Sequence, residues 1–143
     1  MEDTDAKTIA TALLQDTRLE MFGGSYDVWI SSFALPQEVQ TFDGQQILET
    51  VEDLRALYHT LSAHLSRRGI TDIVRYVIAA EFRDPNVIHS THETRLMRGN
   101  QLVDAPYATY SVLRKAATGW QVADSTYAIA DNDDHSKLLV GRL

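Results

Sequence analysis

The sequence predicts a single α+β domain, covering residues 1–143, in which two N-terminal helical segments pack against a strongly curved antiparallel sheet. Apolar residues follow helical periodicity up to about residue 68, and β periodicity takes over from residue 71. Turn signals divide this second part into four segments that are longer than ordinary strands. With 44% hydrophobic residues, the chain has enough apolar material for one core.

The composition narrows the partners that we expect. The net charge of -7 speaks against nucleic acid, because phosphate binding needs a clustered surface of lysine and arginine. No apolar stretch approaches the roughly 20 residues that cross a membrane, and the acidic start Met1–Asp5 is unlike a secretory signal. The absence of cysteine excludes thiolate metal sites and suits a reducing cytoplasm. We therefore expect a soluble cytoplasmic protein with no nucleic-acid and no membrane partner.

The chain opens with one helical segment and one ambiguous segment. Apolar residues at mostly helical spacing predict a helix over Thr8–Phe22, which Gly23 and Gly24 end. The following stretch, Tyr26–Phe33, is compatible with a short helix or with a strand.

A short hairpin is predicted next. Pro36 separates the preceding segment from Glu38–Phe42, which alternates like an edge strand. Asp43 and Gly44 form a strong tight-turn signal, and Gln45–Leu48 is the return strand.

The clearest element is a helix over Val51–Arg68. Thr50 is a suitable N-cap, and acidic residues follow it in the first turn. Gly69 ends the helix. One buried face recurs at three- and four-residue spacing and comprises Val51, Leu54, Leu57, Tyr58, Leu61 and Leu65.

Four long strands complete the predicted fold, roughly over residues 72–83, 86–98, 101–116 and 120–130. Long strands joined by tight turns form a meander that must twist and curl. After a solvated turn at 131–134, Leu138–Val140 is expected to add a last short strand or to dock on a partner.

Two-residue turns would fix a register for the meander. In this register Tyr76 lies opposite Glu93, His89 lies opposite Tyr110, and Arg95 pairs with Asp104. One face then carries Val74, Tyr76, Ile78, Ala80, Phe82, Val87, His89, Thr91, Glu93, Ala108, Tyr110 and Val112. The other carries Ile73, Arg75, Val77, Ala79, Glu81, Ile88, Ser90, His92, Thr94, Leu96, Tyr107, Thr109 and Leu113.

Both predicted faces carry apolar residues, so both should be at least partly covered. Two helices can cover only one face of a sheet. We therefore expect the outer face to meet a second copy of the chain in a two-fold homodimer.

The order of these elements resembles the nuclear-transport-factor-2-like superfamily, and within it the SnoaL-like domains. The resemblance covers about residues 5–130 and is carried by Trp29–Phe33, Asp43-Gly44, Glu52–Leu54 and Gly119–Val122. It implies a cone, in which the sheet wraps around the long helix and leaves a pocket at its open end. Relatives include isomerases, dehydratases, cyclases, epoxide hydrolases, dioxygenase small subunits and binding modules. Catalytic relatives place an Asp or an Asp–His pair inside the cone, and no such pair is matched in this chain.

The predicted register places His89, Tyr110, Tyr76, Thr91 and Glu93 on one face. Inside an apolar cone, His89 and Tyr110 could transfer a proton next to a carbonyl group. The same residues could contact a ligand without catalysis, with Tyr76, Thr91 and Glu93 as ligand-binding groups. They could also form a buried polar network that satisfies itself.

Other side chains are candidates for single roles. Asp27, close to aromatic residues, could be a base with a raised pKa, or an exposed capping residue. Trp29 and Tyr58 are candidate ligand contacts, and core positions are the alternative. His89 and His92 lie three apart on a strand and point to opposite faces, so we expect no metal site there. No cofactor motif is present, and we expect no cofactor.

Our leading hypothesis is a homodimeric protein that binds a small, largely apolar molecule in the cone. One alternative is a cofactor-independent isomerase, dehydratase or cyclase that uses His, Asp and Tyr side chains for proton transfer. The other is a structural subunit or interaction module that uses the outer sheet face.

Overall fold

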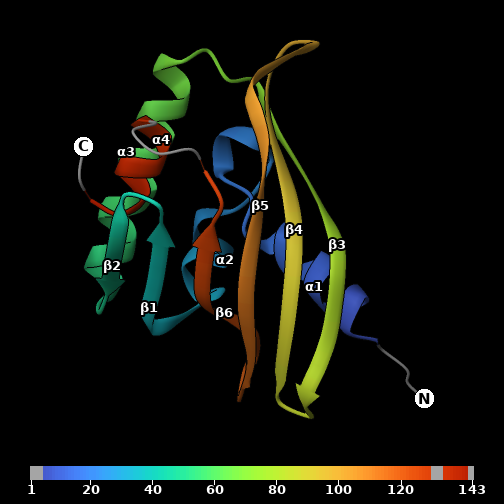
Figure 1. Ribbon diagram of the computed structural model, residues 1–143. Helices are drawn as coiled ribbons and strands as arrows, with labels where there is room; N and C mark the ends of the chain where they lie inside the picture. Colours follow the sequence, from blue (N-terminus) through green and yellow to red (C-terminus); the bar gives the residue numbers. More distant parts are fainter. Residues whose placement is uncertain (1–4, 130–133, 142–143) are drawn as a thin grey trace.

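A computed structural model describes residues 5–129 and 134–141 and confirms an α+β fold with a strongly curved sheet (Figure 1). The elements follow one another as α1 (Ala6–Asp16), a 3-10 turn (Glu20–Phe22), α2 (Tyr26–Ser31), β1 (Phe33–Thr41), β2 (Gly44–Leu48), α3 (Val51–Arg67), β3 (Asp72–Asp84), β4 (Val87–Arg98), β5 (Gln101–Ala116), β6 (Gly119–Tyr127) and α4 (Asp134–Leu139).

The six strands form one sheet in the order β2-β1-β6-β5-β4-β3. The four long strands make the predicted meander, and their bounds lie within three residues of those expected. The hairpin adds to it through a parallel pairing of β1 with β6, so β1 is an inner strand and the expected edge position is wrong. Pro36 lies inside β1 where the pairing with β6 is irregular, so it does not interrupt the strand.

The register of the meander is irregular because its strands contain bulges. Tyr76 lies opposite Glu93 as predicted, but a bulge after Val77 shifts residues 79–82 by one residue, and a second irregularity follows before Asp84. A one-residue shift exchanges the faces, so Ala80 and Phe82 turn inward, against prediction.

A second irregularity lies in β5, between the partners of Thr94 and Leu96. Asp104 adopts a φ of 64° there, which carries it away from the predicted partner Arg95. The Asp104 carboxylate instead accepts a hydrogen bond from the Arg68 guanidinium, with 2.6 Å between Nη2 and Oδ2. The shift here amounts to two residues and preserves the faces. It places Val112, and not Tyr110, opposite His89.

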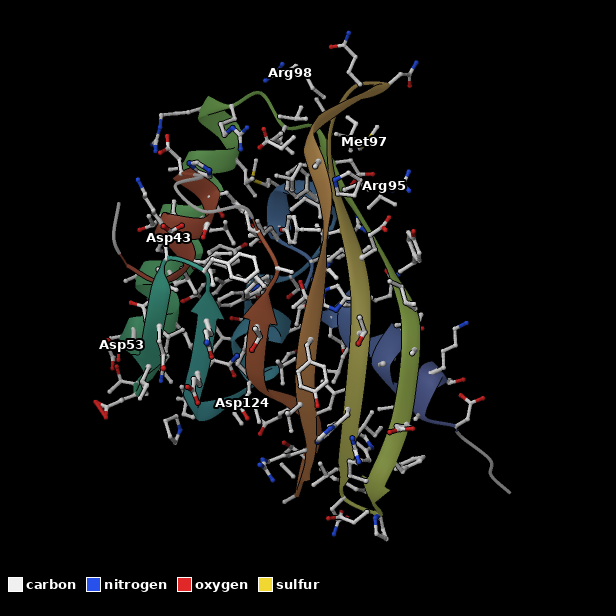
Figure 2. The ribbon with its side chains drawn as sticks, viewed as in Figure 1. Asp43, Asp53, Arg95, Met97, Arg98 and Asp124 are labelled. Carbon is white, nitrogen blue, oxygen red and sulfur yellow. The ribbon has the colours of Figure 1, made fainter. Side chains whose placement is uncertain are left out.

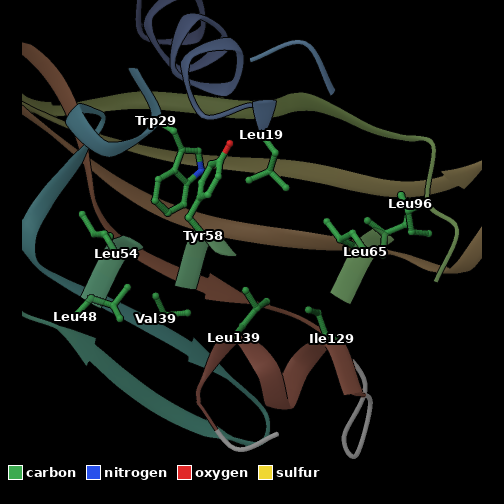
Figure 3. Packing of buried hydrophobic residues seen from close by; sticks show 11 residues of the cluster. Leu19, Trp29, Val39, Leu48, Leu54, Tyr58, Leu65, Leu96, Ile129 and Leu139 are labelled. Carbon is green, nitrogen blue, oxygen red and sulfur yellow. The ribbon is translucent and has the colours of Figure 1, made fainter. Parts of the chain in front are cut away.

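Helix α3 begins and ends close to its predicted limits because of its terminal residues. Thr50 and Asp53 form a capping box: the Thr50 hydroxyl accepts from the Asp53 backbone N–H, and the Asp53 carboxylate accepts from the Thr50 N–H. The buried face of the helix holds Leu54, Tyr58 and Leu65. In Figure 3 Tyr58 lies beside Trp29 within this core, and their ring centroids are 5.0 Å apart.

The C-terminal segment is a helix rather than the predicted strand. Helix α4 packs on α3 and β1 of its own chain. Ser136 is fully buried, and its hydroxyl donates a hydrogen bond to the carboxylate of Asp43 at 2.7 Å. Asp43, labelled in Figure 2, lies in the turn between β1 and β2. Gln46 donates from its side chain to the Leu139 carbonyl oxygen at 3.1 Å. The solvated turn predicted at 131–134 lies almost wholly outside the described residues.

No helix among the described residues has the length and apolarity needed to cross a membrane.

Candidate functional site

A cavity of about 130 Å³ lies between the helices and the inner face of the sheet. Its walls are mainly apolar and come from α1, α2, α3 and the inner face of the sheet, with Leu13, Trp29, Leu57 and Leu61 among them. It adjoins both hydrophobic clusters of the protein, one around α3 and one beneath α1. A single water needs only about 10–15 Å³ by the same measure, so this cavity has room for a small organic molecule.

Arg75 brings a positive charge to this cavity from the inner face of β3. Its guanidinium group donates to the Thr17 hydroxyl at 3.1 Å and to the Leu14 carbonyl oxygen at 2.5 Å. A guanidinium has five N–H donors, so three are left without a protein acceptor in the described part of the chain. Burial lowers the pKa of Arg75, and the phenol groups of Tyr127 and Tyr107 act in the opposite direction. The group nevertheless keeps its charge at neutral pH.

His92 lies beside Arg75 on the cavity wall, supplied by the adjacent strand β4. Burial, together with the positive charge of Arg75, lowers the pKa of His92 to about 4. The ring is therefore neutral at pH 7, with one nitrogen as donor and the other as acceptor. Neither nitrogen has a hydrogen-bond partner among the residues that the structure describes.

Tyr107 and His135 form a second polar group on the wall. The Tyr107 hydroxyl lies 3.2 Å from Nε2 of His135, which α4 supplies. The ring of His135 stacks on His64 of α3 with centroids 5.6 Å apart. Burial, and then the neighbouring His64 and Arg68, lower the pKa of His135 to about 4. Both histidines of the wall are thus neutral hydrogen-bonding groups at pH 7.

The charge of the wall is opposite to that of the whole protein. The chain carries a net charge of -7, yet the lining includes Arg18 and Arg75 and, among the described residues, no aspartate or glutamate. Arg18 is compensated by Asp72, whose carboxylate lies 3.2 Å away. Arg75 has no carboxylate partner in residues 5–129 or 134–141. The uncompensated charge inside the cavity is therefore that of Arg75.

The side chains that the sequence predicted to share one face do share it, but that face is the outer one. The His89 ring nitrogen Nδ1 hydrogen-bonds the Tyr110 hydroxyl, and the Tyr76 hydroxyl donates to Glu93 at 2.6 Å. Thr91 lies between these pairs on β4 and faces outward with them. None of these residues lines the cavity, because the helices pack on the other face.

The remaining predicted site residues are divided. Trp29 is buried and lines the cavity. Tyr58 packs against Trp29 and is buried, but it does not line the cavity. Its hydroxyl accepts a hydrogen bond from the backbone N–H of Glu20 at 2.9 Å. Asp27 is exposed in the first turn of α2 and is not part of the wall.

The prediction that His89 and His92 point to opposite faces is confirmed: His92 lines the cavity and His89 lies on the outer face. Within the described ranges, no three His, Asp or Glu side chains are placed to hold a metal ion.

Sequence reasoning missed Arg75, His92, Tyr107, Tyr127 and His135 as site residues. A usable signal was present for Arg75, His92 and Tyr107, because they share a predicted face with several apolar residues. Polar side chains at such positions either pair with one another or line a cavity. His135 gave no such signal, since its helix was not predicted.

Comparison with known proteins identifies the fold. A ketosteroid isomerase-like protein from Erwinia carotovora atroseptica matches with a TM-score of 0.58 at 16% identity, over 84% of this chain and 92% of that one. An NTF-2-like protein of unknown function from Shewanella oneidensis matches with a TM-score of 0.57 at 9% identity, over 84% and 96%. The chain has the nuclear-transport-factor-2-like fold. A cystatin-like-fold domain of unknown function from Nostoc punctiforme matches this fold with a TM-score of 0.63 at 14% identity, over 90% and 78%.

Neither a protein-family model nor a curated protein matches the sequence. The nuclear-transport-factor-2-like fold is therefore supported by structural likeness, and the chemistry of this chain must be argued from its own cavity.

The neutral histidines predict a pH dependence of stability. In the unfolded chain His92 and His135 take up protons near pH 6.5, whereas in the folded chain they do so only near pH 4. The unfolded state therefore binds more protons between these values, and stability falls as the pH drops from 6.5 toward 4. For each histidine, the free energy of unfolding should be on the order of 2 kcal/mol lower at pH 5 than at pH 7.

Urea unfolding at the two pH values measures this effect. His92→Gln should lose less stability than the wild type on acidification, because one of the titrating groups is gone. His59→Gln, at an exposed position of α3, is the control and should behave like the wild type. An unchanged pH dependence in His92→Gln would contradict the assignment.

Proposed function

We propose that this protein binds a small, largely apolar molecule in the cavity of its nuclear-transport-factor-2-like fold. The observation that carries the proposal is a cavity of about 130 Å³ with mainly apolar walls into which polar side chains such as Arg75 and His92 are set. Small-molecule sites generally combine an apolar wall with a small number of placed polar groups that fix orientation. The absence of cysteine suits a reducing cytoplasm, where we propose that binding takes place.

A second candidate function is cofactor-independent proton transfer. It is favoured by His92, which is neutral, lines the cavity and has both ring nitrogens available in the described part of the chain. A neutral imidazole can remove a proton next to a carbonyl group, and Tyr107 or Tyr127 on the same wall can donate one. This role was predicted for His89 and Asp27, which do not line the cavity.

The outer sheet face supports a homodimer as the assembly. Val74, Tyr76, Ile78 and Tyr110 are 41%, 45%, 52% and 43% exposed there. Contiguous apolar side chains on a sheet face typically mark a protein contact. A second copy of the chain suits this face, because a two-fold axis brings the same patch against itself.

Filling the cavity should abolish ligand binding. Ser90 is buried on the wall, so Ser90→Leu places a larger apolar group in the cavity, and Thr91→Leu changes the neighbouring outward position as a control. We expect Ser90→Leu to weaken binding of the neutral probe 3-phenylpropanamide at least about tenfold, and Thr91→Leu to leave it unchanged. Saturation-transfer NMR measures binding, and circular dichroism verifies folding. Equal binding by wild type and a folded Ser90→Leu variant would count against the cavity as the site.

Proton transfer can be separated from simple binding by isotope exchange. In D₂O, an enzyme of this kind should accelerate loss of the α-hydrogens of 4-phenyl-2-butanone, followed by ¹H NMR. The acceleration should disappear in His92→Gln and persist in His89→Gln, the outer-face control. Exchange no faster than in buffer, with the ketone shown to be bound, would leave binding as the function.

The assembly can be tested by light scattering coupled to size-exclusion chromatography. At micromolar concentration the wild type should have the mass of a dimer, and Ile78→Lys should have the mass of a monomer, because a charge cannot be buried in the contact without a partner. Phe42→Lys, an exposed apolar residue outside this face, should remain dimeric. A monomeric wild type would overturn the proposal.

A further inference from the structure

The uncompensated charge of Arg75 constrains what the cavity can hold. Arg75 is half-buried, and a cation in that position loses part of its hydration, which is costly unless an anion or sufficient hydrogen-bond acceptors replace the water. The described lining contains no carboxylate, and the neighbouring polar groups include His92, Tyr107 and Tyr127, which are neutral at pH 7.

Part of the compensation comes from α1. The two hydrogen bonds of Arg75 go to the last turn of this helix, at Leu14 and at the C-cap residue Thr17. A helix C-terminus carries about half a negative charge, so it stabilises the guanidinium only in part. This helix end also holds the Arg75 side chain in place, and three of its N–H donors have no acceptor among residues 5–129 and 134–141.

The chemistry of that acceptor follows from the site. A carboxylate accepts two parallel hydrogen bonds from a guanidinium and carries the single negative charge that Arg75 requires. A phosphate dianion would need a second free cation, and Arg18 on the same wall is already paired with Asp72 at 3.2 Å. Much of the remaining wall is formed by leucines and aromatic side chains, which suit a hydrocarbon body.

We propose that the ligand of this cavity is a small apolar monocarboxylate whose carboxylate is bound by Arg75. This inference rests on the proposed function, since it requires that the cavity binds a ligand at all. It adds the chemical class of the ligand and the residue that selects it. His92 can donate a further hydrogen bond to the same carboxylate or to a polar group next to it.

The test compares two probes of the same size and shape, the anion 3-phenylpropionate and the neutral 3-phenylpropanamide, by NMR titration at pH 7. Wild-type protein should bind the carboxylate about tenfold to a hundredfold more tightly than the amide, as expected for a charge-assisted pair. Arg75→Gln should bind both probes about equally. The control Arg83→Gln, an exposed arginine of the same strand outside the cavity, should keep the wild-type preference.

The outcomes separate the two proposals. If neither probe binds the wild type, the binding function itself fails. If both bind the wild type with equal affinity, or if a folded Arg75→Gln keeps the preference, the cavity binds molecules but the carboxylate inference is overturned. Because Arg75 also holds α1, Arg75→Gln could fail to fold. Arg75→Lys is then the second variant: it keeps the charge and should show a reduced preference, since lysine lacks the planar fork.

Discussion

The link between Arg75 and the last turn of α1 joins the two parts of this molecule that the cavity separates. Helix α1 packs mainly on β3, and Arg75 of that strand donates to Leu14 and Thr17 of the helix. Removing Arg75 would take one hydrogen-bond donor away from the Leu14 carbonyl oxygen and one from the Thr17 hydroxyl, and would weaken the attachment of the helix end to the sheet. The same guanidinium lies on the cavity wall. The residue that fixes the helix on the sheet is therefore also the one that sets the charge of the site.

The two faces of the sheet divide the remaining polar chemistry. Period-two alternation sends His92 into the cavity and His89 outward, although they are three residues apart on β4. Outside, the polar groups satisfy one another: Tyr76 and Arg95 both donate to Glu93. Inside, Arg75 and His92 keep donors and acceptors that no described side chain uses. Available hydrogen-bonding groups thus gather on the enclosed side of the sheet, as a binding site requires.

Much of the fold could be predicted because its signals are local. The capping residues Thr50 and Gly69 and the spacing of Leu54, Tyr58 and Leu65 were enough to place α3. The candidate site was harder to predict, because it depends on which sheet face the helices cover. The alternation of side chains along a strand does not tell which of the two faces that is. The bulge after Val77 could not be foreseen either, because the turns predict one register for the whole strand and a bulge changes it part-way along. His135 reaches the cavity only through the packing of α4 on distant elements, which the tail sequence does not encode locally.

The contrast between the acidic protein and its cationic cavity bears on selectivity. A net charge of -7 repels anions from the surface, and the single half-buried Arg75 of the cavity attracts them only at short range. The surface repels a multiply charged anion more strongly than a monoanion, and Arg75 can neutralise only one of its charges. A monoanion with an apolar body faces it once, gains the burial of its hydrocarbon against the leucines of α1 and α3, and neutralises Arg75. Apolar burial therefore supplies most of the affinity, and Arg75 selects among the molecules that can enter.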